Sequence, residues 1–250
     1  MTAFWNGFRA LYQRELRQDA GNPLAYVFVA SFVSASSLLA FQVGGLFEAG
    51  RAELGAFFQF HPWLFVVLMP ALSMRAWRDE ARTGTLETLL ALPVPMSALV
   101  LAKFMAAWTL ACLMLVLTTP LWLGLSLLGP MDHGATLTAY FGSCLLAGAY
   151  LAIGMAASAA CRSQVLSFVM ALGVGFLATA AGLPLVSSTL AAFLPLPLTE
   201  ILASFSMLDA FSGFERGVIE ARGLSYFLAV IVFGLCVTGL WVDHRRGGQG

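Results

Sequence analysis

Long apolar runs separated by short charged segments dominate the pattern of hydrophobic and polar positions along the chain. A bilayer core about 30 Å thick needs about 20 apolar residues per helix, and a charge at mid-bilayer costs about 2.5–3.5 kcal/mol. The charged positions therefore mark where each span ends. The runs between them predict six membrane-spanning helices, near residues 24–46, 56–74, 104–128, 136–160, 164–186 and 223–242.

The first twenty residues have a different pattern, in which apolar residues recur at helical spacing and arginines lie elsewhere around the helix. This pattern predicts an amphipathic helix over residues 1–20 that lies at the membrane surface. A plain soluble helix leading into the first span is the alternative. The apolar positions are Phe4, Phe8, Leu11, Tyr12 and Leu16, and the arginines are Arg9, Arg14 and Arg17.

Residues 75–97, between the second and third predicted spans, are too charged at their start to cross the membrane and too apolar afterwards for a solvated loop. Gly84 breaks a first charged helix, and Thr85 can cap a second short one with Glu87 in its first turn. Pro93 stops that second helix. It is either a docking element for a cytosolic partner or an interfacial helix that covers the span ends.

Residues 187–222, between the fifth and sixth predicted spans, mix charged side chains with large apolar ones. Such a segment predicts short helices that lie at, or dip into, the outer leaflet.

Composition narrows the function classes. The chain is 60% hydrophobic and 10% charged, with a mean hydropathy of +0.85 and no net charge, which excludes a soluble enzyme, a nucleic-acid-binding protein and a disordered chain. With the N-terminus inside, all 13 basic residues except Arg51, Arg216 and Arg222 fall in the cytoplasm. The positive-inside rule therefore predicts that both termini are cytoplasmic.

The residues needed for catalysis or energy coupling do not assemble in this sequence. The only lysine, Lys103, does not follow the glycines that a phosphate-binding P-loop requires. The histidines, His133, His244 and His61, lie far apart, and we expect His61 at headgroup level in the second span. No acidic residue lies within a predicted span, as a proton- or sodium-coupled carrier would need. Either the protein is passive or a partner supplies the energy.

Two stretches carry a family resemblance. The sequence from Arg78 to Pro93, RDEARTGTLETLLALP, followed by Lys103, resembles the ABC-2 type permease pattern: an acidic residue, Gly-Thr-Leu/Met-Glu, leucines, a proline, and a lysine at the start of the third span. The sequence FSGFERGVIE, which ends at Glu220, and the following Tyr-Phe-Leu at 226–228 are similar to the end of the gliding-motility GldF-like branch.

The resemblance implies an all-α integral membrane protein with the ABC-2, or type V exporter, fold. Residues 1–250 would form one transmembrane domain of six helices, with an interfacial helix at 1–20, a cytoplasmic coupling helix within 75–97 and short outer re-entrant helices within 187–222. It would be the permease subunit of an ATP-binding cassette exporter in the bacterial cytoplasmic (inner) membrane.

The same resemblance implies partners rather than a cofactor in this chain. Two ATPase subunits would carry the ATP and magnesium, a second permease chain, the same or related, would complete the transporter, and no nucleic acid is involved. The residues that it assigns to the ATPase contact are Glu80, Gly84, Thr85, Leu86, Glu87, Leu90 and Pro93.

The alternative function is a passive or secondary transporter or channel that works without an ATPase. It requires polar residues facing a pathway, and the sequence offers few of them: Ser34, Ser37, Gln42 and Thr118. No substrate-binding residue can be assigned from the sequence.

Overall fold

The computed structural model describes residues 2–44, 54–84, 94–186, 188 and 205–247. Over these ranges every regular element is a helix, and no strand occurs. The helices are α1 (Thr2–Ala20), α2 (Pro23–Gln42), α3 (Gly55–Phe58), α4 (His61–Ser73), α5 (Arg78–Thr83), α7 (Met96–Val116), α8 (Thr119–Ser126), α9 (His133–Ala160), α10 (Gln164–Ala180), α13 (Met207–Glu215) and α14 (Ala221–Gly247).

The described part of the chain holds five helical stretches that are long and apolar enough to cross a membrane. They are Pro23–Gln42, Gly55–Glu80, Met96–Ser126, His133–Ala160 and Ala221–His244, and they match five of the six spans expected from the apolar runs. The remaining run, 164–186, contains a helix of only 17 residues, because α10 ends in a tight turn at Ala181 and Gly182.

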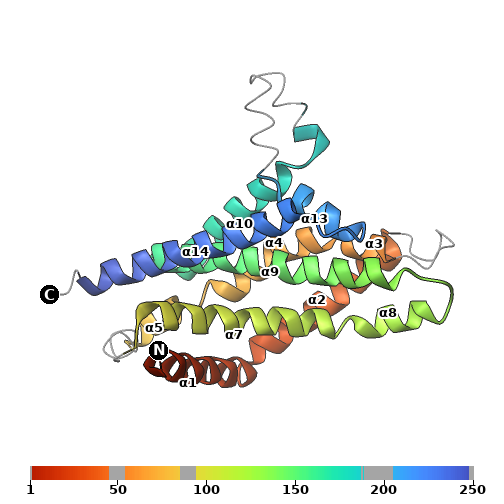
Figure 1. Ribbon diagram of the computed structural model, residues 1–250. Coiled ribbons are helices and arrows are strands. Elements are labelled where there is room, and N and C mark those ends of the chain that lie inside the picture. The colour runs from red at the N-terminus through yellow and green to blue at the C-terminus, as the bar shows by residue number, and fades with distance from the viewer. Residues whose placement is uncertain (1, 45–53, 85–93, 187, 189–204, 248–250) are drawn as a thin grey trace.

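Helix α9 is the centre of the bundle, with α4, α7, α10, α13 and α14 packed around it (Figure 1). Within its membrane-spanning stretch 72% of the residues are buried, against 22% in α14. Alanine and glycine are frequent in α9, and small residues let neighbouring helices approach closely when lipid supplies no hydrophobic driving force. The composition of α9 therefore explains its central position.

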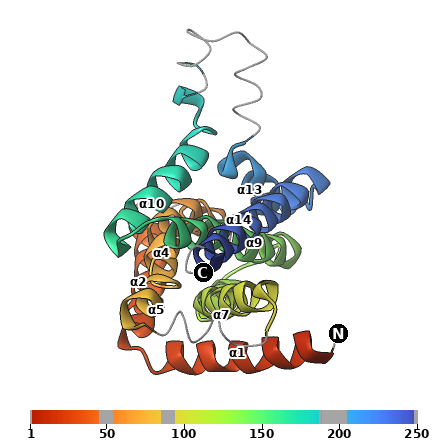
Figure 2. The same ribbon diagram turned by 90° about the vertical axis from the view of Figure 1, so that its left-hand side faces the viewer.

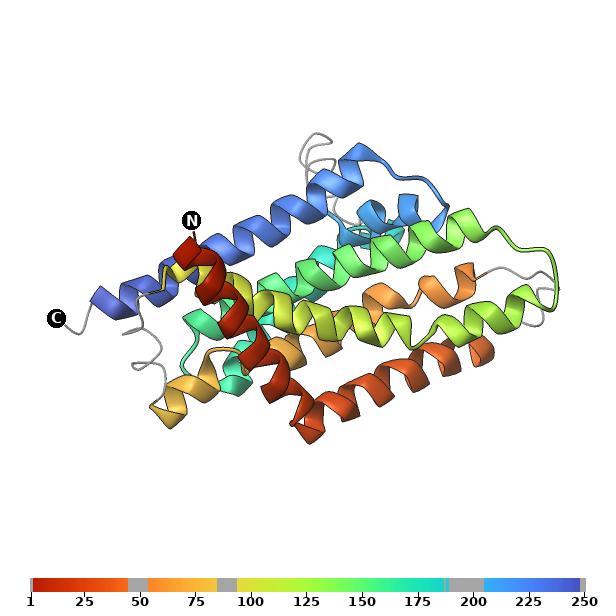
Figure 3. The same ribbon diagram turned by 60° about the horizontal axis from the view of Figure 1, so that its bottom comes forward.

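Helix α1 lies across the bundle beneath α7, as the end-on view in Figure 2 and the tilted view in Figure 3 both show. The amphipathic helix predicted over 1–20 is present, and its apolar face packs on protein. Leu11 is buried, and the Tyr12 hydroxyl hydrogen-bonds Thr109 Oγ1 of α7 at 2.9 Å. Arg9 and Arg17 are exposed on the other side.

His61, expected at headgroup level, is the first residue of α4 and faces the interior of the protein. Its side chain is fully buried, and Nδ1 hydrogen-bonds Ser143 Oγ of α9 at 2.8 Å. Rings from α2, α3 and α4 surround the imidazole, because the turn between α3 and α4 folds two phenylalanines back over it. These rings are Phe32, Phe57, Phe58 and Phe65, with centroids 4.7–5.5 Å from the imidazole.

The contact between α9 and α14 generates a first prediction. A methyl group added at Gly234 of α14 would lie 2.9 Å from backbone atoms of Ala152, whereas one added at Gly239 of the same helix meets no atom within 4 Å. We expect Gly234→Ala to lower the free energy of unfolding by about 1–3 kcal/mol through overpacking. Gly239→Ala should be neutral or stabilise by up to about 1 kcal/mol, since alanine is the better helix former. Thermal unfolding in mild detergent measures both, and an equal effect of the two variants would contradict this packing.

Candidate functional site

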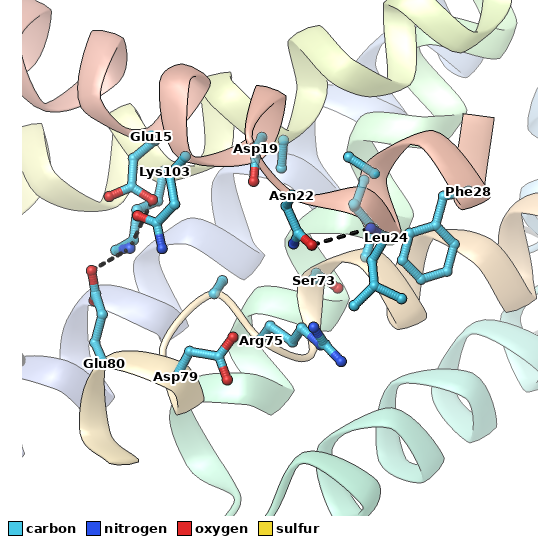
Figure 4. Close-up of a pocket in the computed structure, with 15 residues that line it drawn as sticks. Glu15, Asp19, Asn22, Leu24, Phe28, Ser73, Arg75, Asp79, Glu80 and Lys103 are labelled. Atoms are coloured by element: carbon cyan, nitrogen blue, oxygen red, sulfur yellow. Dashed lines mark hydrogen bonds and ion pairs between the residues drawn. The ribbon is translucent and has the colours of Figure 1, made fainter. Parts of the chain in front are cut away.

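Four charged side chains from three helices meet at one end of the bundle. The Lys103 ammonium lies 2.8 Å from Glu80 Oε1 and 3.1 Å from Glu15 Oε2, and Arg14 Nη2 lies 3.3 Å from the same Glu80 oxygen. Figure 4 shows Glu15, Glu80 and Lys103 converging from different helices. We call these four residues the Lys103 cluster; it joins α1, α5 and α7.

Local sequence places each member of the cluster. Pro95, in an extended conformation, precedes the first turn of α7 and sets Lys103 two turns into that helix. Glu80 lies in the first turn of α5, where a carboxylate is favourable to the helix dipole. Arg14 and Glu15 lie in the second half of α1, on the side that crosses α7. The cluster therefore depends on the transverse position of α1.

The cluster is largely removed from solvent. The side chains of Lys103 and Glu80 are 4% and 6% exposed, and that of Glu15 is 14% exposed. Burying an ammonium is costly unless it is paired, and here two carboxylates accept it. The ring of Trp77, with its centroid 5.4 Å from Nζ, adds a cation–π contact. Two cations and two carboxylates make the cluster electrically balanced.

A small polar cavity adjoins the cluster. Its volume of about 90 Å³ is well above the roughly 10–15 Å³ that one water molecule needs. Besides Glu15, Glu80 and Lys103, its wall includes Asp19 and Arg75. Burial, together with the charge of Glu15, raises the pKa of Asp19 to about 6 against the opposing charge of Lys103. The cavity is therefore a charged space, large enough for water, between α1, α2, α4, α5 and α7.

Hydrogen bonds hold the segment before Gly84 to two more helices. Ser158 Oγ of α9 donates to the Met74 carbonyl at 3.0 Å and accepts from the Trp77 N–H at 3.3 Å. Gln164 Nε2, at the start of α10, donates to Asp79 Oδ1 at 2.5 Å. Residues 74–80 thus contact α1, α7, α9 and α10, and a displacement of this segment acts on all four helices.

The sequence-predicted site residues divide into two groups. Glu80 points inward to Lys103, and Gly84 is exposed at the end of α5 with a φ of +73°, the left-handed conformation expected where a glycine breaks a helix. The others, Thr85, Leu86, Glu87, Leu90 and Pro93, lie outside the described residues. Sequence reasoning missed Glu15, although a single lysine at the edge of an apolar span is itself a signal that a buried carboxylate is near.

The cluster has no arrangement typical of catalysis. Among the described residues no group of three or more histidine, cysteine, aspartate or glutamate side chains is placed to hold a metal ion. What the arrangement provides is a connection between the segment before Gly84 and the spans.

Comparison with known families shows to which family of membrane proteins the chain belongs. Residues 25–241 match the model of the ABC-2 family transporter proteins. The chain belongs to this family. It is therefore a multi-pass membrane protein and a permease of an ABC transporter, a family whose members associate with an ABC ATPase. A search of curated proteins finds no match.

The buried charges of this ABC-2 permease generate a second prediction. Lys103→Met leaves Glu15 and Glu80 without their common cation, so we expect it to lower the free energy of unfolding by about 3–5 kcal/mol. Adding Glu15→Gln and Glu80→Gln to that variant should recover part of the loss, since neither carboxylate is then left buried without a cation. Chemical denaturation in detergent, followed by tryptophan fluorescence, gives the free energy of unfolding of the wild type, the single variant and the triple variant.

Arg216→Met is the matched control, because it breaks the exposed pair with Glu220, whose closest N–O distance is 3.9 Å. An exposed pair contributes about 0–1 kcal/mol. If Lys103→Met cost no more than Arg216→Met, the cluster would not be the structural element described above.

Proposed function

We propose that this permease is the membrane subunit of an ATP-driven exporter in a bacterial cytoplasmic membrane. Two ATPase subunits bind the segment 75–97, and a second permease chain, identical or related, completes the transporter. The resemblance of the stretch that ends at Glu220 supports a place in the GldF-like branch. ATP and magnesium belong to the ATPase subunits, and this chain needs no cofactor of its own.

The Lys103 cluster is the observation that carries the proposal. A transporter with a separate ATPase needs a cytoplasmic element that moves with the ATPase and a rigid link from that element to the spans. Here α5 leads directly into residues 85–93, and Glu80 fixes it to α7 and, through Arg14, to α1. ATP-driven closure of the partner would shift α5, and the buried ion pairs would pass that shift to the third span and the interfacial helix.

In this mechanism the contact residues have different roles. Glu80 acts as a positioning residue, because its carboxylate is occupied by Lys103 and faces away from solvent. Gly84 ends α5 with a positive φ, and the residues that follow it in the sequence, Glu87 among them, are those that we assign to the ATPase contact. The surface that touches the partner therefore begins after Gly84.

We further propose that α10 is the sixth span and that both termini are cytoplasmic. Its 17 residues extend about 25 Å, a few ångströms short of the roughly 30 Å hydrocarbon core, and local thinning of the bilayer accommodates such a mismatch. Figure 1 shows the N-terminus and the end of α14 at the same end of the bundle, and this supports an even number of crossings. The basic residues of α1 and of the segment before Gly84 support a cytoplasmic location of that end.

The docking role generates a third prediction. Glu87→Arg should reduce permease-stimulated ATP hydrolysis at least fivefold while expression and detergent monodispersity stay normal, because it reverses a charge on the docking surface. The assay is vanadate-sensitive ATPase activity of the complex purified through a tag on the permease. Asp243→Arg, an equal charge change at an exposed position of α14, should leave the activity unchanged. Normal stimulation of ATP hydrolysis by the Glu87→Arg variant would exclude this docking site. In a separate assay, transport of solutes into liposomes by the permease without any partner would favour the passive transporter.

The orientation generates a fourth prediction. In intact cells a membrane-impermeant maleimide should label Ile219→Cys, which is exposed between α13 and α14, but not Gly84→Cys. Permeabilised cells should show labelling of both, with the wild-type chain as the background for its own cysteines. The reverse labelling in intact cells would overturn the orientation, and labelling of both positions from one side would overturn the sixth span.

A further inference from the structure

An apolar groove runs between α10 and α14, with α9 as its floor. Its volume is about 820 Å³, within the roughly 300–1,000 Å³ of ligand pockets. Small residues such as Ala157 and Gly234 form the floor and walls, and the rims carry Leu177 and Phe233, whose side chains are 70% and 72% exposed. The groove is open along its length to whatever surrounds the bundle.

A polar pocket of about 590 Å³ continues this groove at the end where α14 begins. The two cavities share Phe205, Tyr226 and Ala229. The polar pocket contains three charged side chains, those of Asp209, Glu220 and Arg222, with two serines beside them. The combined site is therefore apolar over most of its length and charged at one end only.

The part of the groove that α14 lines matches one leaflet of a bilayer in length. Tyr226, at the junction with the polar pocket, and Val237, the last α14 residue in the lining, are eleven residues apart, which corresponds to about 16 Å along the helix axis. Half of a hydrocarbon core about 30 Å thick is about 15 Å. An acyl chain that begins at the polar pocket would thus fill the part of the groove between α10 and α14, and the floor continues beyond it to Ala160 and Cys161 at the end of α9.

The charges of the polar pocket complement a zwitterionic headgroup. Arg222 is exposed and offers the geometry that binds phosphate oxygens, while Asp209 and Glu220 supply carboxylates for a cation. Burial raises the pKa of Asp209 and the charge of Arg222 opposes this, so the two groups lie within electrostatic range of each other. Arg216, outside the pocket, lies 3.9 Å from Glu220, so a purely anionic headgroup that took Arg222 would leave Asp209 without a cation.

We propose that this site holds one phospholipid with a zwitterionic, ammonium-bearing headgroup, taken from the leaflet on the α13 side. One acyl chain occupies the groove between α10 and α14, the phosphate faces Arg222, and the ammonium faces Asp209 and Glu220. The proposal concerns this chain alone and does not depend on the ATPase partner.

The test is lipid retention by the full chain. The protein is assembled into nanodiscs of equal parts phosphatidylethanolamine and phosphatidylglycerol, released into mild detergent, and analysed by native mass spectrometry. We expect one retained phosphatidylethanolamine per permease chain, in at least fivefold excess over phosphatidylglycerol. Ala229→Trp, which fills the junction of the two cavities, and Arg222→Gln should each lower retention at least fivefold.

Matched controls separate the site from the general surface. Val169→Trp places a tryptophan on an exposed face of α10 outside the groove, and Arg9→Gln removes an exposed arginine of α1, far from the pocket; both should retain the lipid. Equal retention of phosphatidylglycerol, or unchanged retention with Arg222→Gln, would overturn the proposal. So would a disulfide-linked dimer of Phe233→Cys, because a second copy would then cover the groove.

Discussion

A buried ammonium must be paired, and this requirement at Lys103 determines how this end of the permease is built. Its side chain is only 4% exposed, so the charge is tolerated only where carboxylates reach it. One comes from α1 and the other from α5, and each is itself nearly buried. The transverse helix, the segment before Gly84 and the third span are thus held together by one cation, with Arg14 balancing the remaining charge.

Because of this constraint, the segment before Gly84 is connected to several helices at once. Residues 74–80 are tied to α7 by Glu80, to α9 by Ser158 and to α10 by Asp79 and Gln164. Movement of this segment therefore cannot stay local, because closely packed helices shift as bodies rather than deform continuously. The charged pocket at the start of α14 lies at the opposite end of the bundle from the ion pairs, which separates the proposed coupling element from the proposed headgroup site.

Local patterns in the sequence predict local structure well in this protein. Five apolar runs become spans because no other environment satisfies both their side chains and their backbone, and Gly84 breaks its helix because it adopts a positive φ. Long-range contacts are harder to predict. Glu15 and Lys103 are 88 positions apart, and no periodicity connects them. The burial of His61 likewise depends on a distant residue, Ser143 of α9, to which it hydrogen-bonds. Helix α10 ends in a turn at Ala181 and Gly182, and no proline stands at the first position of that turn.

Hydrogen–deuterium exchange of α1 in wild-type protein and in Lys103→Met tests most directly whether the buried ammonium holds this end together. The account predicts slow exchange across residues 9–20 in the wild type and exchange at least tenfold faster in the variant, with α9 unchanged in both. Equal exchange of α1 in the two proteins would show that apolar contacts alone fix the transverse helix. The Lys103 cluster would then not be the link between the segment before Gly84 and the spans.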